Sequence, residues 1–294
     1  MRNQIYFIIV LTLLQETMAQ STDFQWWNER HGWDGISPYE KYMHIEPGRM
    51  GPNALPVPDL VFFVWDSLNY LKGNVQTYFA PGDFTFSGGW QVYYQADRRV
   101  AISAHMVYAE FFKTSESVRD FRVARTFDAR GWAVGDLYVE THWLMVRSRR
   151  WIPEVILRSG IKTASGNRLE DARFSDTPGY YFDLNFRKVF KKNFIVHQWY
   201  SMMGFYAYQT YRVDYKQNDA LLYGVGWRFQ TRTIGLDTHL RGYAGYFGKY
   251  DKPLIFSFSF FRQLESYLLS VRFQRGNHSW PFWSAELGFV YRFF

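Results

Sequence analysis

Repeated alternation of apolar and polar residues is the feature that most constrains this chain. From about residue 71 onward, segment after segment places large apolar side chains at every second position. In residues 180–187, Tyr180, Phe182, Leu184 and Phe186 share one face, and Tyr181, Asp183, Asn185 and Arg187 share the other. A helix has a period of 3.6 residues and would scatter this pattern, whereas a strand gathers it onto two faces. The pattern predicts an antiparallel sheet.

The alternating segments are about twelve in number, and most are long enough to cross a membrane. They are expected near 72–80, 84–96, 100–112, 132–147, 151–163, 179–190, 193–209, 219–231, 233–247, 253–264, 266–275 and 281–294. A tilted transmembrane strand needs roughly nine to eleven residues, whereas strands of soluble sheets cluster near five or six. Such strands must form a closed ring in lipid, because hydrocarbon leaves no partner for an open sheet edge. We therefore expect an all-β, closed antiparallel transmembrane barrel over residues 71–294.

The connections support this prediction. Very short turns near residues 97–99, 148–150, 191–192, 232 and 265 alternate with mostly longer links, of which 114–131 and 164–178 are the longest. Short turns on the periplasmic rim and longer loops on the outer rim are typical of outer-membrane barrels. Both ends of the barrel chain are then expected on the periplasmic side.

The two ends of the chain carry export signals. Residues 1–19 combine Arg2, an apolar run over 5–14 and small residues at 17 and 19, which predicts a secretory signal peptide. The apolar run is too short for a membrane-spanning helix. At the other end, Phe289, Tyr291 and Phe293 alternate with polar or small residues before Phe294. This end resembles the terminal signal that the barrel-assembly machinery recognises, although Phe294 is one residue out of phase.

Composition agrees with an exported barrel. Aromatic residues make up 21% of the chain, yet its mean hydropathy is −0.31, as expected where apolar residues are dispersed among polar ones. Cysteine is absent, which suits an oxidising compartment. The net charge of +7 is spread along the chain without a basic block, so we expect no nucleic-acid partner. The expected partners are outer-membrane lipids, the barrel-assembly machinery and a small solute.

Subtracting the apolar faces predicts the lining of the lumen. This lining is polar, with acidic and basic side chains nearly balanced. It indicates either a narrow, mildly cationic channel or a plugged interior. We expect Asp237, His239 and Arg241 to share one inward face, where a structural salt network is favoured over solute binding. The candidate lining residues are Asp136, Glu140, His142, Glu154, Arg158, Lys162, Asp183, Arg187, Arg228, Asp237, His239, Arg241, Arg272 and Arg292.

Residues 20–70 differ from the rest of the chain. They contain four tryptophans and a Pro- and Gly-rich run over 47–58, and they lack a strand-like repeat. We expect a periplasmic or plug-like extension that packs in or below the barrel. A disordered linker is the alternative, because a Pro-rich run needs no core of its own.

One stretch resembles a known group of channels. Residues 161–167, IKTASGN, lead to residues 176–183, DTPGYYFD. Together they resemble the strand, glycine loop and strand of small transporter-like outer-membrane proteins, of the broad group that includes the phenol-degradation and fatty-acid channels. The resemblance implies passage of a small solute that need not be polar, and it assigns no functional residue.

Catalytic signatures are absent from the sequence. It has no Walker loop, dinucleotide fingerprint, HExxH motif or metal-binding Cys/His spacing, so we expect no cofactor, metal or catalytic residue. Asn277-His278-Ser279 is a suggestive cluster, but neighbouring strand residues point to opposite faces, so a hydrogen-bonded loop is the favoured interpretation. A solute channel is the leading hypothesis; a lipid-modifying enzyme and a structural barrel with a filled lumen are the alternatives.

Overall fold

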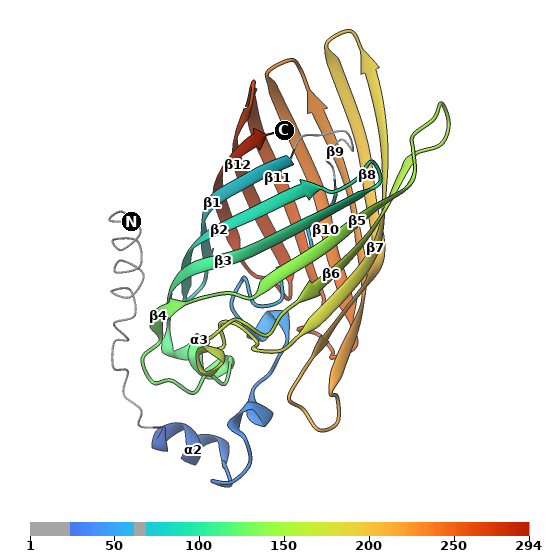
Figure 1. Ribbon diagram of the computed structural model, residues 1–294. Helices are drawn as coiled ribbons and strands as arrows, with labels where there is room; N and C mark the ends of the chain where they lie inside the picture. Colours follow the sequence, from blue (N-terminus) through green and yellow to red (C-terminus); the bar gives the residue numbers. More distant parts are fainter. Residues whose placement is uncertain (1–23, 62–68, 294) are drawn as a thin grey trace, which may run out of the picture.

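A closed ring of antiparallel strands dominates the computed structural model, which describes residues 24–61 and 69–293 (Figure 1). Each strand of the ring pairs with the next strand of the ring, and β1 pairs with β13 to close it. Within the described residues the ring comprises twelve strands: β1 (Asn69–Ala80), β2 (Asp83–Gln95), β3 (Val100–Thr114), β5 (Leu137–Val146), β6 (Glu154–Lys162), β7 (Gly179–Lys192), β8 (Ile195–Gln209), β9 (Gln217–Gln230), β10 (Ile234–Gly245), β11 (Pro253–Leu264), β12 (Tyr267–His278) and β13 (Trp283–Phe293). The predicted closed barrel is confirmed.

The predicted segment 132–147 forms two strands rather than one. A short strand, β4 (Arg130–Ala133), and β5 pair with β3 in the same register but are separated by residues 134–136. There the side chain of Asn167 accepts a hydrogen bond from the Val134 amide, and Ser165 accepts one from Leu137. These loop side chains accept hydrogen bonds from the amides at the two ends of the interruption, while the Gly135 amide within it still donates to the Val107 carbonyl of β3.

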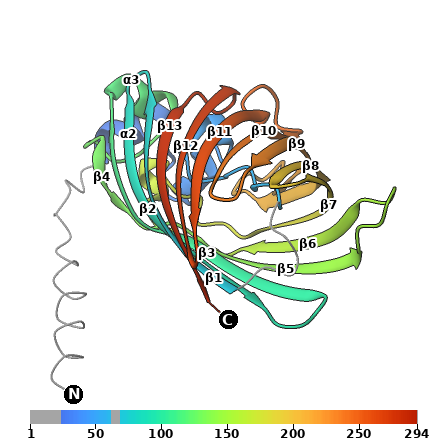
Figure 2. The same ribbon diagram turned by 90° about the horizontal axis from the view of Figure 1, so that it is seen from above.

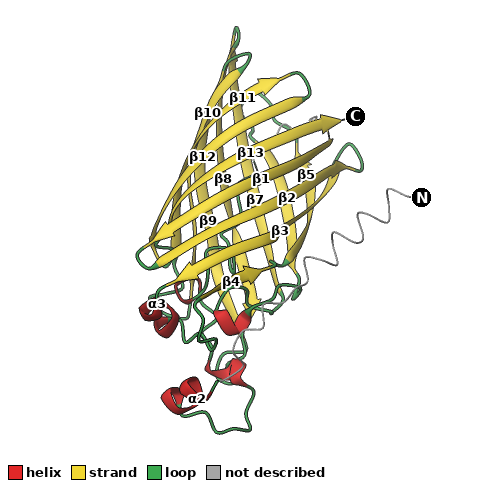
Figure 3. Ribbon diagram, turned by 90° about the vertical axis from the view of Figure 1, so that its left-hand side faces the viewer, coloured by secondary structure: helices red, strands yellow, loops and turns green. Residues whose placement is uncertain are grey.

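The two rims of the barrel differ, with one departure from the prediction. Short turns join β2 to β3, β7 to β8, β9 to β10 and β11 to β12, and β1 begins and β13 ends at this short-turn rim. The link from β5 to β6 on the same rim spans residues 147–153 and is longer than the predicted turn at 148–150. The opposite, long-loop rim carries the helix α3 (Glu116–Phe121) and the 3-10 turn η3 (Leu169–Asp171). Figure 3 shows the helical elements gathered at this end.

The N-terminal segment runs from the long-loop rim into the lumen. It contains the helix α2 (Gln25–His31) and the 3-10 turns η1 (Tyr39–Tyr42) and η2 (Pro47–Arg49). From Met43 to Val61 most of its apolar side chains are almost fully buried, and they pack against wall residues such as Tyr206 and Tyr243. Viewed from above, this blue segment lies within the ring of strands (Figure 2). We call residues 43–61 the lumen segment.

The sequence-predicted end signals lie partly outside the described residues. Nothing is described of residues 1–19 or of Phe294. Phe289 and Tyr291 point outward, with 45% and 41% exposed, and Phe293 lies in phase with them. Their recognition by the assembly machinery remains a prediction.

Candidate functional site in the barrel lumen

The two faces of the wall have opposite chemistry. On the outside, Leu221 and Val225 of β9 and Leu287 of β13 are 58–60% exposed, although all three are apolar. On the inside, charged side chains such as Asp237 and Glu286 are buried. An apolar exterior around a polar interior is the inverse of a soluble domain and matches a wall that faces lipid.

The candidate lining residues point inward. Most of them are buried, and Arg228, Arg272 and Arg292 are partly exposed and line an internal cavity of about 590 Å³. The structure divides the candidates into several ion-pair groups rather than one continuous ring. Their part in selecting a solute remains a prediction.

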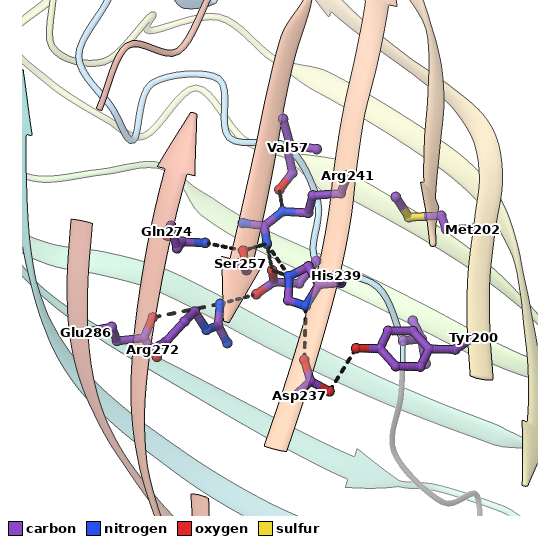
Figure 4. A network of polar contacts seen from close by, with 12 residues as sticks. Val57, Tyr200, Met202, Asp237, His239, Arg241, Ser257, Arg272, Gln274 and Glu286 are labelled. Carbon is purple, nitrogen blue, oxygen red and sulfur yellow. Dashed lines mark hydrogen bonds and ion pairs between the residues drawn. The ribbon is translucent and has the colours of Figure 1, made fainter. Parts of the chain in front are cut away.

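The predicted face of Asp237, His239 and Arg241 forms a connected network (Figure 4). Asp237 accepts hydrogen bonds from Tyr200 at 2.8 Å and from the Arg228 Nε at 3.0 Å. The Nδ1 of His239 lies 3.0 Å from Asp237, and its Nε2 lies 2.7 Å from the Arg241 guanidinium. A guanidinium only donates, so Nε2 is the acceptor and the imidazole is neutral with its proton on Nδ1.

A second network surrounds Arg158. Its guanidinium lies 3.0 Å from Asp183 and 3.3 Å from Glu140, and Tyr181 donates a hydrogen bond to Glu140. Ser103 donates to the other Glu140 oxygen, and His142 lies 3.3 Å from it. The acceptors of both carboxylates are thus satisfied by wall side chains, which is required when charges are taken out of water.

The remaining candidate ion pairs lie toward the rims. Lys162 contacts Asp136 at 2.8 Å and donates to Ser175 in the long loop after β6. Arg187 contacts Glu154 at 2.6 Å near the short-turn rim. These pairs connect β6 with the residue that precedes β5 and with β7, and they join the wall to a loop.

Asp59 of the lumen segment joins the Arg241 network, and sequence reasoning did not select it. Its carboxylate oxygens lie 2.6 Å from the Arg241 Nη1 and 3.0 Å from the Arg272 Nη1. Arg272 also lies 3.9 Å from Glu286, which is paired with Lys72 at 2.8 Å. The sequence did contain a signal for this contact, because Asp59 is the single acidic residue between Pro47 and Val61 and a buried segment needs a partner for such a charge.

Wall side chains also hold the backbone of the lumen segment. The carbonyls of Pro52, Leu55, Val57 and Asp59 each accept a hydrogen bond from a side chain of the wall or its loops. Trp280, Tyr243, Arg241 and Arg158 are the respective donors, at 2.8–3.2 Å. A chain that crosses a lumen without pairing as a strand needs such partners for its buried carbonyls. The lumen segment is therefore specifically accommodated.

A buried cluster fixes the lumen segment at Gly51 and Asn53. Arg173, fully buried, contacts Glu110 at 2.7 Å and donates to Thr85 at 2.8 Å. Asn53 of the lumen segment donates to the same Glu110 at 2.6 Å. The amide of Gly51 donates to the Ala172 carbonyl at 2.8 Å, so the segment is tied to the loop that carries Arg173.

Outside the long-loop rim, α2 and its flanks dock through arginines on aromatic rings. Arg125 lies over Phe24 at 4.1 Å and over Tyr39 at 4.6 Å, and Arg119 lies over Trp26 at 4.5 Å. Arg30 of α2 pairs with Asp120 at 2.8 Å. Cation–π contacts of this kind each contribute roughly 0.5–2 kcal/mol.

In the Asn277-His278-Ser279 cluster, the serine has a structural role. Ser279 donates to the Lys249 carbonyl and accepts from the Lys252 amide, both at 2.9 Å, so its hydroxyl joins two loops. Within the described ranges 24–61 and 69–293, no cluster of three potential metal-ligating side chains is present. No helix of that same part of the chain is long and apolar enough to cross a membrane.

The fold and the lumen define a transmembrane antiparallel β-barrel with an occupied interior. Its structure is similar to that of an outer-membrane channel from Pseudomonas putida F1, with 12% identity and a TM-score of 0.53 over 82% of this chain and 98% of that chain. The KdgM porin is more distant, with 9% identity and a TM-score of 0.44 over 76% of this chain and 99% of that one. At these identities the likeness shows the fold alone. No protein-family model matches the sequence, and no curated relative was found.

Proposed function

We propose that this protein is a porin-like channel of the bacterial outer membrane that passes small solutes and is closed by its lumen segment. The observation that carries the proposal is a polar cavity of about 590 Å³ inside a wall whose outer face is apolar. Its lining includes Tyr70, Gln263 and Arg292 near the short-turn rim and Pro52 and Asp59 of the lumen segment. A rearrangement of that segment would extend the cavity toward the other rim.

The exported barrel has two further partners in this proposal. Outer-membrane lipids contact the apolar outer face, and the barrel-assembly machinery reads β13 through Phe289, Tyr291 and Phe293. The contact with lipids is supported by the exposed side chains of β13, among which Trp283, Leu287 and Phe289 are large and apolar. Tyr94, Trp143 and Trp283, each at least half exposed, are suited to the membrane–water interface.

Catalysis is not part of the proposed function. The Asn277-His278-Ser279 cluster has its serine engaged by two backbone groups, which gives it no base to accept its proton. A lipase assay on the wild type and on His278→Ala tests this: equal activity of the two proteins removes the cluster from consideration.

A filled structural barrel is the second candidate function, because most apolar side chains of the lumen segment are buried and several of its carbonyls are hydrogen-bonded to the wall. Planar-bilayer conductance separates the two. We expect small or rare currents from the wild type and steady, larger currents from a variant that lacks residues 24–61.

Circular dichroism and slower gel migration after boiling serve as controls that the shortened chain still forms a barrel. A folded, shortened barrel that neither conducts nor swells liposomes would exclude the channel and leave the structural barrel. A wild type that conducts as freely as the shortened chain would exclude closure by the lumen segment.

A further inference from the structure

The Asp59 carboxylate is bound by arginines in the way that the carboxylate of a small solute would be bound. Arg241 and Arg272 approach its two oxygens separately, at 2.6 and 3.0 Å. The Asp59 side chain is 41% exposed, and because it lines the internal cavity its exposed part faces that space. A carboxylate held by two arginines and open to a cavity on its remaining side can exchange with a similar group.

The charge around Asp59 requires an anion at this position. Among the described residues, Asp59 is the one carboxylate within ion-pair distance of Arg241. Arg272 pairs with Asp59 and, at 3.9 Å, with Glu286. Glu286 is shared with Lys72. Lys72, Arg241 and Arg272 supply three positive charges against one negative charge of Glu286, so these four wall side chains carry a surplus of two, and the neighbouring Asp237 is paired with Arg228. The neutral His239 does not change this balance.

The Arg241 guanidinium is held by wall side chains in addition to Asp59, and Arg272 has the ion pair with Glu286 at 3.9 Å. Arg241 donates to the Ser257 hydroxyl at 3.2 Å and to the neutral His239 at 2.7 Å. Ser257 in turn accepts from Gln274 at 3.1 Å (Figure 4). A site whose donors are fixed before binding loses little side-chain freedom when the ligand arrives. Charge-assisted hydrogen bonds to a carboxylate are about twice as strong as neutral ones.

We propose that Arg241 and Arg272 form a carboxylate-binding site in the lumen, which Asp59 occupies from within the same chain. A small solute that carries a carboxylate takes the place of Asp59 when the lumen segment rearranges. This inference rests on the proposed channel function and names its solute class.

The test uses full-length Asp59→Asn in detergent, where the amide removes the negative charge that pairs with the two arginines without changing the size of the side chain. We expect 100 mM potassium propionate to raise the unfolding midpoint of this variant by about 2–4 °C relative to potassium chloride of the same concentration. The wild type should respond by less than about 1 °C, because Asp59 competes with the added anion. Propionamide, which has the same size but no charge, should have no effect.

Substitutions in the Asp59→Asn background locate the effect. Arg272→Gln should abolish the rise, whereas Arg262→Gln, on an exposed position of β11, should leave it intact. Potassium phosphate forms a separate arm of the experiment. A rise with phosphate but not with propionate, or a rise that survives Arg272→Gln, would overturn the proposal.

Hydrogen exchange of the wild type provides a measurement that does not depend on the variant folding. Propionate at high concentration should speed exchange of the Val61 amide, which donates to Asn185, by displacing Asp59, and an unchanged rate would count against the site. Binding without conductance in the shortened barrel would remove the channel and keep the site. Conductance without any response to propionate would remove the site and keep the channel.

Discussion

At the scale of single residues, Gly51 shows how closely the lumen segment fits its surroundings. A Cβ atom at this position would lie 2.7 Å from the Arg173 Cζ. The guanidinium has no room to withdraw, because Glu110 and Thr85 hold it and it is fully buried. Gly51→Ala should therefore lower the free energy of unfolding by about 1–3 kcal/mol. Gly73→Ala is the control, since nothing lies within 4 Å of its added Cβ; equal effects of the two changes in thermal unfolding would contradict this account.

Asp171 gives the long-loop rim a dependence on pH. Burial, with the neighbouring Glu170 carboxylate, raises the pKa of Asp171 to about 7, and Arg168 opposes this only in part. A pKa above the unfolded value of 3.8 means that the protonated form is favoured by folding. The contribution to stability is thus complete below about pH 4 and is lost as the pH rises through 7.

We expect amide exchange in residues 166–174 to speed up between pH 6 and pH 8 beyond the intrinsic effect of hydroxide. Asp171→Asn, which cannot ionise, should remove this extra acceleration. The exposed Asp128 is the matched site for a control, because Asp128→Asn should leave the acceleration unchanged. A wild-type profile that follows intrinsic exchange throughout would rule out the titration.

Single lining residues were predictable where alternation fixes the face of a strand. The inward position of Asp237, His239 and Arg241 follows from their spacing of two. Their partner Asp59 lies more than 170 residues earlier in the chain, in a segment without periodicity. A contact of that kind depends on how the ring closes, which no local pattern contains.

At the scale of elements, the prolines of the lumen segment have a physical role. Pro52, Pro56 and Pro58 have no amide hydrogen, so each removes a donor that would need a partner in the lumen. The neighbouring carbonyls still need donors, and the wall supplies them. The same composition that permits a disordered linker therefore also suits a chain threaded through a barrel, and the sequence alone did not distinguish the two.

One of these donors can be removed without disturbing the packing. Tyr243→Phe deletes the hydroxyl that donates to the Leu55 carbonyl at 3.2 Å. We expect a loss of about 1–2 kcal/mol, because the buried carbonyl is left without this partner. Tyr94→Phe, on the exposed outer face, is the control and should change the denaturation midpoint little. Identical midpoints for the two variants would show that the hydrogen bond does not hold the segment.

The strands were the elements best predicted from sequence, since their alternation is imposed by two different environments on the two faces. The interruption at residues 134–136 was not foreseen. There Asn167 and Ser165, some thirty residues away, accept hydrogen bonds from the Val134 and Leu137 amides at its two ends. Hydrogen bonds to side chains of a distant loop cannot be predicted from the alternation of apolar and polar residues.

At the scale of the whole molecule, the lumen segment places α2 at the rim opposite to the start of β1. If the long loops face outward, as in other barrels of this class, the described N-terminal residues lie outside the cell. An epitope inserted at Gly35, which has open space around it, should bind antibody on intact cells. An epitope in the short turn at residues 97–99 should bind only after the outer membrane is permeabilised. The reverse pattern would contradict this orientation.

The threading of the chain also limits how the barrel can open. Residues before the lumen segment are fastened outside one rim by Arg125 and Arg119 on aromatic rings, and β1 is fixed into the wall by β2 and β13. The segment is thus a strap anchored at both ends rather than a stopper with a free end. Neither end can be withdrawn without unfolding its anchor, so any opening must come from slack or bending in the middle. Such a strap returns to its seat after every opening, because it never diffuses away.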